Sequence, residues 1–514
     1  MTEVAVVSSD LLRLGGLLTA TGPAMELRSP VTGEVIGELP TSTPADVEVG
    51  AQLAHRAQSE WAARPIDERA RLLLDFHDRL LDRRDYLVDL LQSVGKDRLS
   101  AANEVLHVAL TARYYGRTAR RYLRSERGEG ILPLLTRVDR HYVPKGLVGV
   151  IGPWNYPLTM TISDGLAALV AGNAIMLKPD HQTPLVALAA VELLRTAGLP
   201  ADVWQVVHGR GTVVGRELID VSDYVSFTGS TATGRTVAAQ CAGRLIGCSL
   251  ELGGKNPLVI LDDADVEGAA EGAVRAAFSN AGQVCVSIER IYVAEPLFEA
   301  FVRAFVVRTQ AIRLGNAPDF DHDMGSLINY DQLERVSAHV EDAKAKGATV
   351  LIGGRRREDL GELFYEPTIL TGVTPEMECH AEETFGPVVS VYPVIDDDEA
   401  VARANDSDYG LNASVWTSDH DRGRRVARNI KCGSVNINEG FAATLGSLDA
   451  PMGGMKNSGL GRRQGQDGIR RFVEVQSVAT QNGIPLAPSH GLDGKSFITA
   501  MTGALRMMKK VGRA

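Results

Sequence analysis

Between residues 147 and 230, short apolar runs alternate with helical patterns, and this feature limits the fold more than any other. The runs are LVGVIGPWNYP, NAIMLKPD, VWQVVHGRG and YVSFTGSTATG, and each ends in Gly, Pro or a small polar residue. A helical pattern over 183–197 follows the second run. Strands that alternate with helices indicate βαβ units and a mostly parallel sheet. Ligands of such sheets bind where the strands end, so these four ends predict a nucleotide crevice.

The length of the chain calls for a second unit of the same kind. A chain of 514 residues exceeds the roughly 250–300 residues that a single core supports. After ELGGKNPLVIL at 251–261, the pattern predicts a helix over 267–281, a strand over 288–294 and a helix over 297–312. We therefore expect two α/β domains.

The first quarter of the chain is predicted to be mostly helical. Residues 27–40 read as a hairpin, and Pro44 then opens a helix to about Ala63, with Thr43 as its cap. A second helix is expected from Asp67, with apolar residues at helical spacing as far as Leu91. A third helix should run over about 101–123, followed by an extended arm over 131–144.

Charge and composition exclude several classes of function. The net charge of −10 argues against nucleic acid as a partner. The start, MTEVAVVSSDLLRLGGLL, lacks the basic region of a signal peptide. No uncharged stretch reaches the roughly 20 residues of a membrane span. We therefore expect a cytoplasmic protein. The five widely spaced cysteines contain no zinc-type pair and are expected to be reduced, and no metal site is predicted.

The tail, residues 484–514, is rich in Lys and Arg and has an apolar helical face. Two interpretations are open. It is a peripheral membrane helix, or it is a short helix packed on the body of the protein or a frayed end.

Three residues outside the regular patterns could carry chemistry. Cys285 lies among small residues in FSNAGQVCVSIERIYV, between a helix and an apolar strand, with no His near it in sequence. Glu251, in SLELGGKN, is either a salt-bridge partner of Lys255 or a carboxylate whose pKa burial raises, fit to act as a general base. Asn155, in PWNYP, either donates to a developing oxyanion or makes an Asx-turn.

Several motifs, taken in order, resemble the aldehyde dehydrogenase superfamily. They are PWNYP, LKPD, FTGST, ELGGKNP, GQVC, EETFGPV and PMGGMKNSGLGR, and the resemblance covers about residues 27–481. Neither the GxGxxG fingerprint nor a GxSxG elbow occurs. The resemblance implies two Rossmann-like α/β domains with parallel-rich sheets plus a small bridging β-arm.

The resemblance also implies roles for the three candidates. Cys285 would attack the aldehyde carbon, and the side chain of Asn155 with the Cys285 backbone N–H would form the oxyanion hole. Oxidation would leave a thioester, and Glu251 would activate the water that hydrolyses it to a carboxylic acid. Family members that transfer the acyl group to coenzyme A generally lack this Glu, so hydrolysis is expected and acyl transfer is the alternative.

The cofactor-binding residues implied by the resemblance are Trp154, Asn155, Lys178, His181, Gly229, Ser230, Leu252, Glu383 and Phe385. NAD-preferring relatives often have an acidic residue three places after the Lys, where this chain has His181. An acidic residue would repel a 2′-phosphate, whereas Lys178 would attract it. NADP is therefore the predicted cofactor, with NAD possible, unless Asp180 turns inward.

The substrate is expected to be a small aldehyde. The chain looks most like succinic semialdehyde dehydrogenases, so oxidation of succinic semialdehyde to succinate is the named prediction. Typical members of that group carry two arginines that grip the substrate carboxylate, and here those places hold Ser279 and a helix start with Asp164 but no Arg. Tyr156 and Phe441 would suit a medium-chain or aromatic aldehyde, which is the alternative.

The resemblance divides the chain into regions. Residues 1–130 and 145–250 would bind the cofactor, and 251–435 would form the catalytic domain. Residues 131–144 and 473–483 would be oligomerisation strands of a homodimer or homotetramer, which would cover an otherwise unpaired edge. A hypothesis of another class is a catalytically silent structural protein with the same fold, and the intact candidate residues weigh against it.

Overall fold

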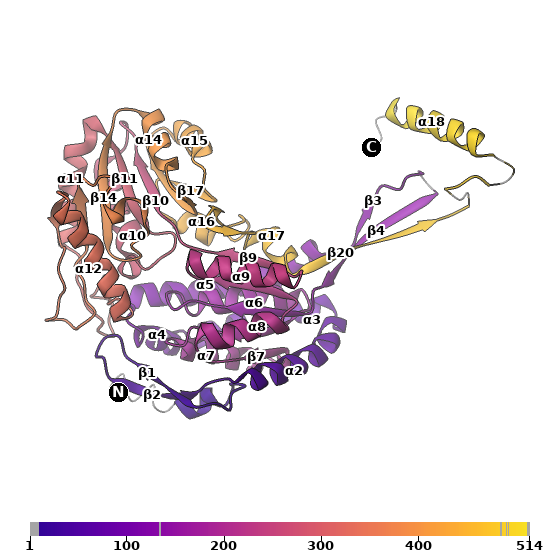
Figure 1. Ribbon diagram of the computed structural model, residues 1–514, viewed down its shortest axis with the longest axis horizontal. Helices are drawn as coiled ribbons and strands as arrows, with labels where there is room; N and C mark the ends of the chain where they lie inside the picture. Colours follow the sequence, from indigo (N-terminus) through magenta and orange to yellow (C-terminus); the bar gives the residue numbers. More distant parts are fainter. Residues whose placement is uncertain (1–9, 133–134, 484–485, 490, 492, 511–514) are drawn as a thin grey trace.

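The computed structural model describes residues 10–132, 135–483, 486–489, 491 and 493–510. Two α/β bodies and a projecting ribbon make up the described chain (Figure 1). The N-terminal segment is predicted to contain no signal peptide. Residues 1–9 of that segment lie outside the described residues. Arg513 of the basic tail lies outside them as well.

The first body is built on a six-stranded sheet. Its order is β19-β9-β8-β5-β6-β7, in which β19 is antiparallel to β9 and the other five strands are parallel. The strands span Leu147–Ile151 (β5), Ala174–Lys178 (β6), Trp204–Val206 (β7), Tyr224–Thr228 (β8), Gly247–Glu251 (β9) and Gly459–Leu460 (β19). Both β5 and β6 are buried along their whole length, which explains their unbroken apolar runs. The parallel sheet predicted from the four runs is confirmed.

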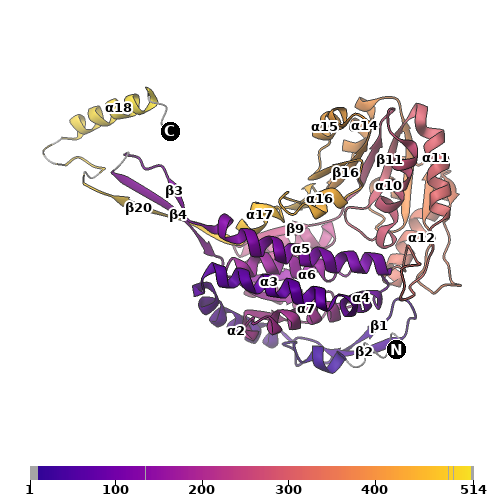
Figure 2. The same cartoon turned by 180° about the vertical axis from the view of Figure 1, so that it is seen from behind.

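Helices cover both faces of this sheet (Figure 2). They span Pro44–Ala63 (α2), Ile66–Asp82 (α3), Arg84–Gln92 (α4), Arg98–Leu123 (α5), Thr159–Val170 (α6), Pro184–Thr196 (α7), Arg216–Val221 (α8) and Thr231–Gly243 (α9). The N-terminus of α2 is the predicted one: Thr43 Oγ1 accepts from the Asp46 N–H at 3.2 Å, and Asp46 accepts from the Thr43 N–H at 2.8 Å. This reciprocal pair is a capping box. The hairpin before it is β1 (Ala24–Arg28) with β2 (Val35–Pro40), also as predicted.

One predicted helix is two helices. The apolar spacing from Asp67 to Leu91 predicts a single helix, but Arg83, with φ −104° and ψ 16°, separates α3 from α4. Leu80 before the break and Leu87 after it are buried in the same core. The apolar period therefore continues through a break that the residue pattern does not mark.

The second body has a seven-stranded sheet in the order β12-β13-β14-β11-β10-β16-β17, parallel except for β12. Its strands span Asn256–Ile260 (β10), Ile288–Ala294 (β11), Thr349–Ile352 (β12), Thr368–Thr371 (β13), Val388–Val394 (β14), Asn412–Trp416 (β16) and Ser434–Ile437 (β17). The main helices span Val266–Phe278 (α10), Glu295–Gln310 (α11), Tyr330–Ala345 (α12), Asp397–Asn405 (α14) and His420–Asn429 (α15). The predicted second α/β unit is thus confirmed.

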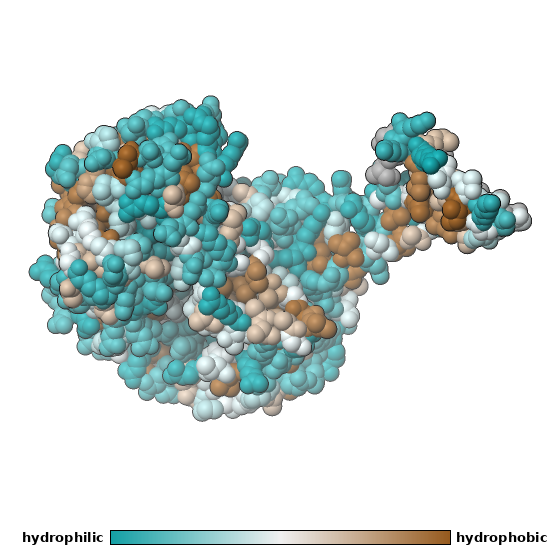
Figure 3. Space-filling model, turned by 45° about the horizontal axis from the view of Figure 1, so that its top comes forward, coloured by the Kyte–Doolittle hydropathy of each residue, from teal (hydrophilic) through white to brown (hydrophobic). Residues whose placement is uncertain are grey.

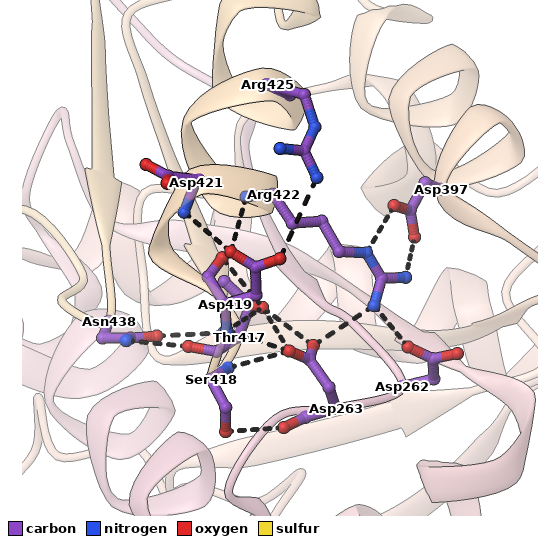
Figure 4. Close-up of polar contacts among 10 residues, drawn as sticks. All are labelled: Asp262, Asp263, Asp397, Thr417, Ser418, Asp419, Asp421, Arg422, Arg425 and Asn438. Atoms are coloured by element: carbon purple, nitrogen blue, oxygen red, sulfur yellow. Dashed lines mark hydrogen bonds and ion pairs between the residues drawn. The ribbon is translucent and has the colours of Figure 1, made fainter.

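Arg422 of α15 ties together the acidic loops of the second body (Figure 4). Its guanidinium binds Asp397 at 2.6 and 2.8 Å and Asp262 at 2.6 Å. Asp263 accepts from the hydroxyl of Thr417 at 2.8 Å. The arginine therefore pairs with these carboxylates and offsets part of their negative charge. No group of three or more His, Cys, Asp or Glu residues in the described part of the chain is placed to hold a metal ion.

The ribbon is a three-stranded antiparallel sheet that projects from the first body (Figure 1). Strand β20 (Val473–Gln481) pairs with β4 (Thr136–Pro144) along its whole length, and β3 (Glu126–Gly128) pairs with the other edge of β4. On β20, Val475 is 58% exposed and Val478 44% exposed.

The tail forms a helix beyond the ribbon. This helix, α18 (Gly494–Lys510), has no buried residue and lies away from both bodies (Figures 1 and 2), so the interpretation of a helix packed on the body is wrong. Apolar side chains are exposed on the ribbon and on α18 (Figure 3). Among the described residues, no helix is long and apolar enough to cross a membrane.

Candidate functional site

The loop that carries Cys285 lies between α10 and β11 and is held by the start of β10. The side-chain amide of Asn256 donates to the backbone carbonyls of Cys285, at 2.8 Å, and of Ser287, at 2.7 Å. A Cβ atom on Gly254 would lie 2.7 Å from the Cys285 carbonyl oxygen. Glycine is therefore needed at that place in ELGGKN, because the two segments approach so closely.

Helix α10 ends at Phe278, three residues earlier than predicted. The following turn has left-handed backbone at Asn280, with φ 51°, and at Ala281, with φ 55°. Such conformations are costly for residues other than glycine and often occur at functional sites. The turn ends the helix and directs the chain to Cys285.

Two clefts meet at Cys285. The first is lined by Pro153, Trp154, Asn155, Met160, Thr228, Gly229, Ser230, Glu251, Leu252, Gly253, Cys285, Gln332, Arg335, Glu383 and Phe385. The second is lined by Ser100, Asn103, Glu104, Leu106, His107, Leu110, Tyr156, Thr159, Met160, Ser279, Val284, Cys285, Val286, Phe441, Ala442, Leu445, Gly446 and Met452. Cys285 and Met160 line both, so ligands bound in the two clefts would meet at the thiol.

Glu251 is the last residue of β9 and is 3% exposed. Among the described residues, neither of its carboxylate oxygens has a hydrogen-bond partner. The alternative of a salt bridge with Lys255 is wrong, because that ammonium group binds Glu289. Burial raises the pKa of Glu251 to about 7, and Arg463 and Arg471 partly oppose this rise. Such a pKa suits a general base near neutral pH.

Burial also raises the pKa of Cys285, to about 12, and the carboxylates of Glu251 and Glu383 contribute to the rise. The resting thiol is therefore protonated, which differs from the lowered pKa of many reactive cysteines. The proton must therefore leave the thiol before the sulfur can attack.

Asn155 follows β5 and faces the Cys285 loop. Its Nδ2 donates to the Gln283 carbonyl at 3.0 Å, and the residue is 7% exposed. A side-chain amide nitrogen carries two hydrogens, so the second can serve a ligand in the first cleft. This long-range bond differs from the local Asx-turn that the sequence left open.

The first cleft also has features that suit a dinucleotide. Ser230 caps the N-terminus of α9 by accepting from the Thr233 N–H at 3.3 Å, and helix N-termini bind phosphate groups. The rings of Trp154 and Phe385 pack edge to face with centroids 5.5 Å apart. Phe385 has left-handed backbone, with φ 56°.

A half-buried carboxylate completes this side of the cleft. Glu383 Oε1 accepts from the Gly254 N–H at 2.7 Å. Burial and the neighbouring Glu289 raise the pKa of Glu383 to about 8. A Cβ atom on Gly253 would lie 2.4 Å from Glu383 Oε2, so Gly253 gives the carboxylate its room.

Lys178 and His181 lie at the end of β6 and are not among the residues that line the first cleft. Lys178 Nζ donates to the Pro179 carbonyl at 3.1 Å. The ring of His181 lies 3.4 Å from Asp180 Oδ1, which also accepts from the Gln182 N–H at 2.9 Å. The Asp180 carboxylate is thus engaged by its own loop.

The second cleft is lined by Tyr156 and Phe441, and the carboxylate of Glu104 that also lines it is already paired. Glu104 Oε2 lies 3.1 Å from Lys96 Nζ, and both side chains are almost fully buried. None of the described residues that line this cleft is Lys or Arg. Burial lowers the pKa of His107 to about 4, so this ring is neutral at physiological pH.

Some residues of the site were missed by the sequence reasoning. Gln332 and Arg335 of α12 line the first cleft, and Met160 lines both clefts. Gln332 and Arg335 lie on a helix surface where nothing in the local pattern separates them from solvated side chains. Asp164 was named from the sequence only because no Arg occurs at that helix start. The structure places it in a buried ion cluster with Arg463.

Comparisons with known proteins agree on one family. Residues 18–478 match the aldehyde dehydrogenase family. A Mycolicibacterium smegmatis protein, provisionally named succinate-semialdehyde dehydrogenase [NADP(+)], is 48% identical over 98% of both chains. A similarly named protein of Mycobacterium tuberculosis is 49% identical over 96% of both.

Solved structures are similar as well. An aldehyde dehydrogenase from Brucella melitensis biovar abortus has a TM-score of 0.86 and 34% identity, covering 90% of this chain and 95% of its own. Betaine aldehyde dehydrogenase from Staphylococcus aureus, solved in complex with NAD+, has a TM-score of 0.88 and 31% identity, with coverages of 93% and 98%.

Proposed function

The chain belongs to the aldehyde dehydrogenase family, and on that basis we propose that it oxidises an aldehyde to the free carboxylic acid through a thioester on Cys285. The observation that carries this proposal is the position of Cys285, which lies where the two clefts meet. Glu251 lines the first of these clefts. The second cleft would admit the aldehyde and the first the cofactor.

In the proposed mechanism, the Cys285 thiol gives its proton to solvent water in the cleft, and its sulfur attacks the aldehyde carbon. The amide of Asn155 and the backbone N–H of Cys285 donate to the resulting alkoxide. A nicotinamide cofactor bound in the first cleft would accept a hydride from the carbon of this adduct, which would leave the thioester on Cys285. Glu251 then takes a proton from water, and the hydroxide attacks the thioester carbon. The acid leaves, and the proton on Glu251 passes to the departing sulfur, which regenerates the Cys285 thiol and the Glu251 carboxylate.

We propose NADP as the preferred cofactor, with NAD accepted. The N-terminus of α9 at Gly229 and Ser230 would hold the pyrophosphate, with Leu252 beside it. Glu383 would bind a ribose, and Trp154 and Phe385 would flank the nicotinamide end. Lys178 and His181, at the end of β6, would receive the 2′-phosphate. The names of the mycobacterial relatives, which specify NADP(+), support this choice.

Hydrolysis is proposed rather than transfer to coenzyme A, because Glu251 is retained and its pKa lies near neutrality. A coenzyme A requirement for turnover would establish the alternative. A catalytically silent protein is the third candidate, and turnover that depends on Cys285 would rule it out.

Two substrates are candidates, each with its own support. The provisional names of the relatives support succinic semialdehyde, which we propose as the first substrate to test. The lining of the second cleft supports an uncharged medium-chain or aromatic aldehyde, because it offers Phe441, Tyr156 and no Lys or Arg among the described residues. A substrate carboxylate there would lack a cationic partner.

We also propose that the regions of the chain have the roles expected from the sequence. Residues 1–130 and 145–250 would bind the cofactor, 251–435 would supply the nucleophile, and the ribbon strands would join subunits into a homodimer or homotetramer. The exposed apolar residues of β20, Val475 and Val478, support the last point, because such an edge is otherwise prone to aggregation. A cytoplasmic location stays a prediction.

One panel experiment tests the proposed function. The purified protein is assayed with succinic semialdehyde, hexanal and benzaldehyde, each with NADP and with NAD, by the absorbance of the reduced cofactor. Cys285→Ala is the inactive control, and Cys432→Ala, at a buried cysteine that lines neither cleft, is the matched one. We expect kcat/KM to be higher with NADP. Failure of every aldehyde with both cofactors would refute the proposal.

A further inference from the structure

Glu251 has an unusual setting for a base that must ionise. It is buried, and among the described residues neither carboxylate oxygen has a hydrogen-bond partner. Burial alone disfavours the ionised form. The charge of Glu251 must therefore depend on ionised groups that lie close by without bonding to it.

A buried ion cluster close to Glu251 consists of Asp164, Arg463 and Arg471. Asp164 Oδ1 is 2.7 Å from Arg463 Nη2 and 2.7 Å from Arg471 Nη2, and the three side chains are at most 8% exposed. Ser226 donates to Asp164 Oδ2 at 2.7 Å. Two guanidinium groups share one carboxylate, so the cluster carries one net positive charge in a buried place.

The cluster is built into the same strands as Glu251. Arg471 Nη1 donates to the Ser249 hydroxyl at 3.0 Å, two residues before Glu251 on β9. Arg463 follows β19, whose Gly459 pairs with Glu251 itself. The Arg463 backbone also exchanges hydrogen bonds of 2.8 and 2.7 Å with Met452 of the second cleft. The arginines are therefore held in place relative to the base.

We propose that Asp164, Arg463 and Arg471 act as one positioning cluster, in which two arginines anchored by one carboxylate keep Glu251 able to ionise and to act as the base of thioester hydrolysis. The inference rests on the proposed function, since it concerns the same hydrolytic step. Each arginine favours the charged form of Glu251 and Asp164 opposes it.

Other titratable groups lie near Glu251 and the cluster and also affect the pH dependence of Glu251. They are Arg462 beside Arg463, His107 and Tyr115 of α5, and Cys285 and Glu383 in the first cleft. Burial keeps His107 neutral and Tyr115 protonated near pH 7. Arg462 ranks after the cluster residues in its effect on Glu251. Among these charges, those of the cluster act most strongly on Glu251, although burial has the larger effect on its pKa.

The test follows loss of the acyl-enzyme directly. A single turnover is quenched at intervals between pH 5.5 and about 9, and intact mass gives the amount of thioester that remains. Arg463→Gln and Arg471→Gln should each move the midpoint of the hydrolysis rate upward by at least about half a pH unit. Asp164→Asn should move it downward, because both arginines stay and their counter-charge is lost.

Opposite shifts separate an electrostatic role from a structural one, because a loosened fold would slow hydrolysis in all three variants alike. Arg463→Lys keeps the charge and should restore the midpoint. Arg470→Gln is the matched control, since Arg470 bonds to the Tyr122 carbonyl and Glu126 and is not among the groups that act most strongly on Glu251. If Arg463→Gln does not fold, the Arg471 variant and the Lys variant carry the test.

Two different failures are distinguishable. Unchanged midpoints in Arg463→Gln, Arg471→Gln and Asp164→Asn, with normal turnover, would overturn the positioning cluster and leave the proposed function intact. No acyl-enzyme in the wild-type protein, or an unchanged pH profile in Glu251→Gln, would overturn the proposed function itself.

Discussion

Lys96→Met should be among the most damaging single changes outside the residues that react. Lys96 Nζ lies 3.1 Å from Glu104 Oε2, 3.3 Å from Asn280 Oδ1 and 3.9 Å from the centroid of the Tyr156 ring. The Lys96 side chain is 3% exposed and that of Glu104 is 0% exposed. Solvent cannot replace the lost ammonium group at such a place.

The magnitude follows from what remains of Glu104. Its Oε1 still accepts from the backbone N–H groups of Leu158, at 2.8 Å, and Thr159, at 2.9 Å. Its charge is nevertheless left without a cation, which costs about 3–5 kcal/mol for a buried pair. The same carboxylate holds the start of α6, which directly follows the Asn155 loop, so kcat/KM should fall as well.

The double variant Lys96→Met/Glu104→Gln is the matched control. Its amide oxygen can still accept from Leu158 and Thr159, and no charge is buried, so it should recover at least about half of the lost free energy of unfolding. Denaturant unfolding of the three proteins measures this recovery. If Lys96→Met costs less than about 1 kcal/mol, or if the double variant is no more stable than the single one, the account of this pair is wrong.

Three further predictions concern the reacting residues and the proposed cofactor site. Burial raises the pKa of Glu251 to about 7, so its ionised fraction grows from about one tenth at pH 6 to about nine tenths at pH 8. Thioester hydrolysis should therefore accelerate about 10-fold over that range. A rate of hydrolysis that does not change with pH would contradict this. Cys285→Ser should abolish formation of the reduced cofactor while Cys432→Ser retains it, and equal activities would remove the assigned nucleophile. His181→Asp should lower kcat/KM for NADP relative to NAD by at least about 10-fold, and steady-state kinetics showing an unchanged ratio would exclude that residue from the 2′-phosphate site.

Much of the fold could be predicted because its signals are local. The strands β5 and β6 are buried on both faces and so appear as continuous apolar runs. The start of α2 could be read from Thr43 and Pro44, because a cap is made by neighbours in sequence. The break at Arg83 had no such signal, since the apolar spacing continues from Leu80 to Leu87 across it.

The residues of the candidate site also differ in whether a local signal marks them. Cys285, Glu251 and Asn155 lie in short motifs and could be chosen from the sequence. The partner of Lys255 could not, because it is Glu289, 34 residues away, and not the nearby Glu251. Likewise, Asp164 and Arg463 are separated by 299 residues. Long-range ion pairs depend on the tertiary fold, so only the structure shows which charges surround the base.

The most direct test of the central claim is a pre-steady-state measurement on Glu251→Gln. If Cys285 forms the thioester and Glu251 activates the water that cleaves it, mixing the variant with NADP and aldehyde should give a burst of about one reduced cofactor per active site, followed by turnover at least about 100-fold slower than in the wild type. Intact mass should then show the acyl group on the protein. If the variant instead turns over at the wild-type rate and shows no burst, the claim is contradicted, because another group would then be the base of hydrolysis.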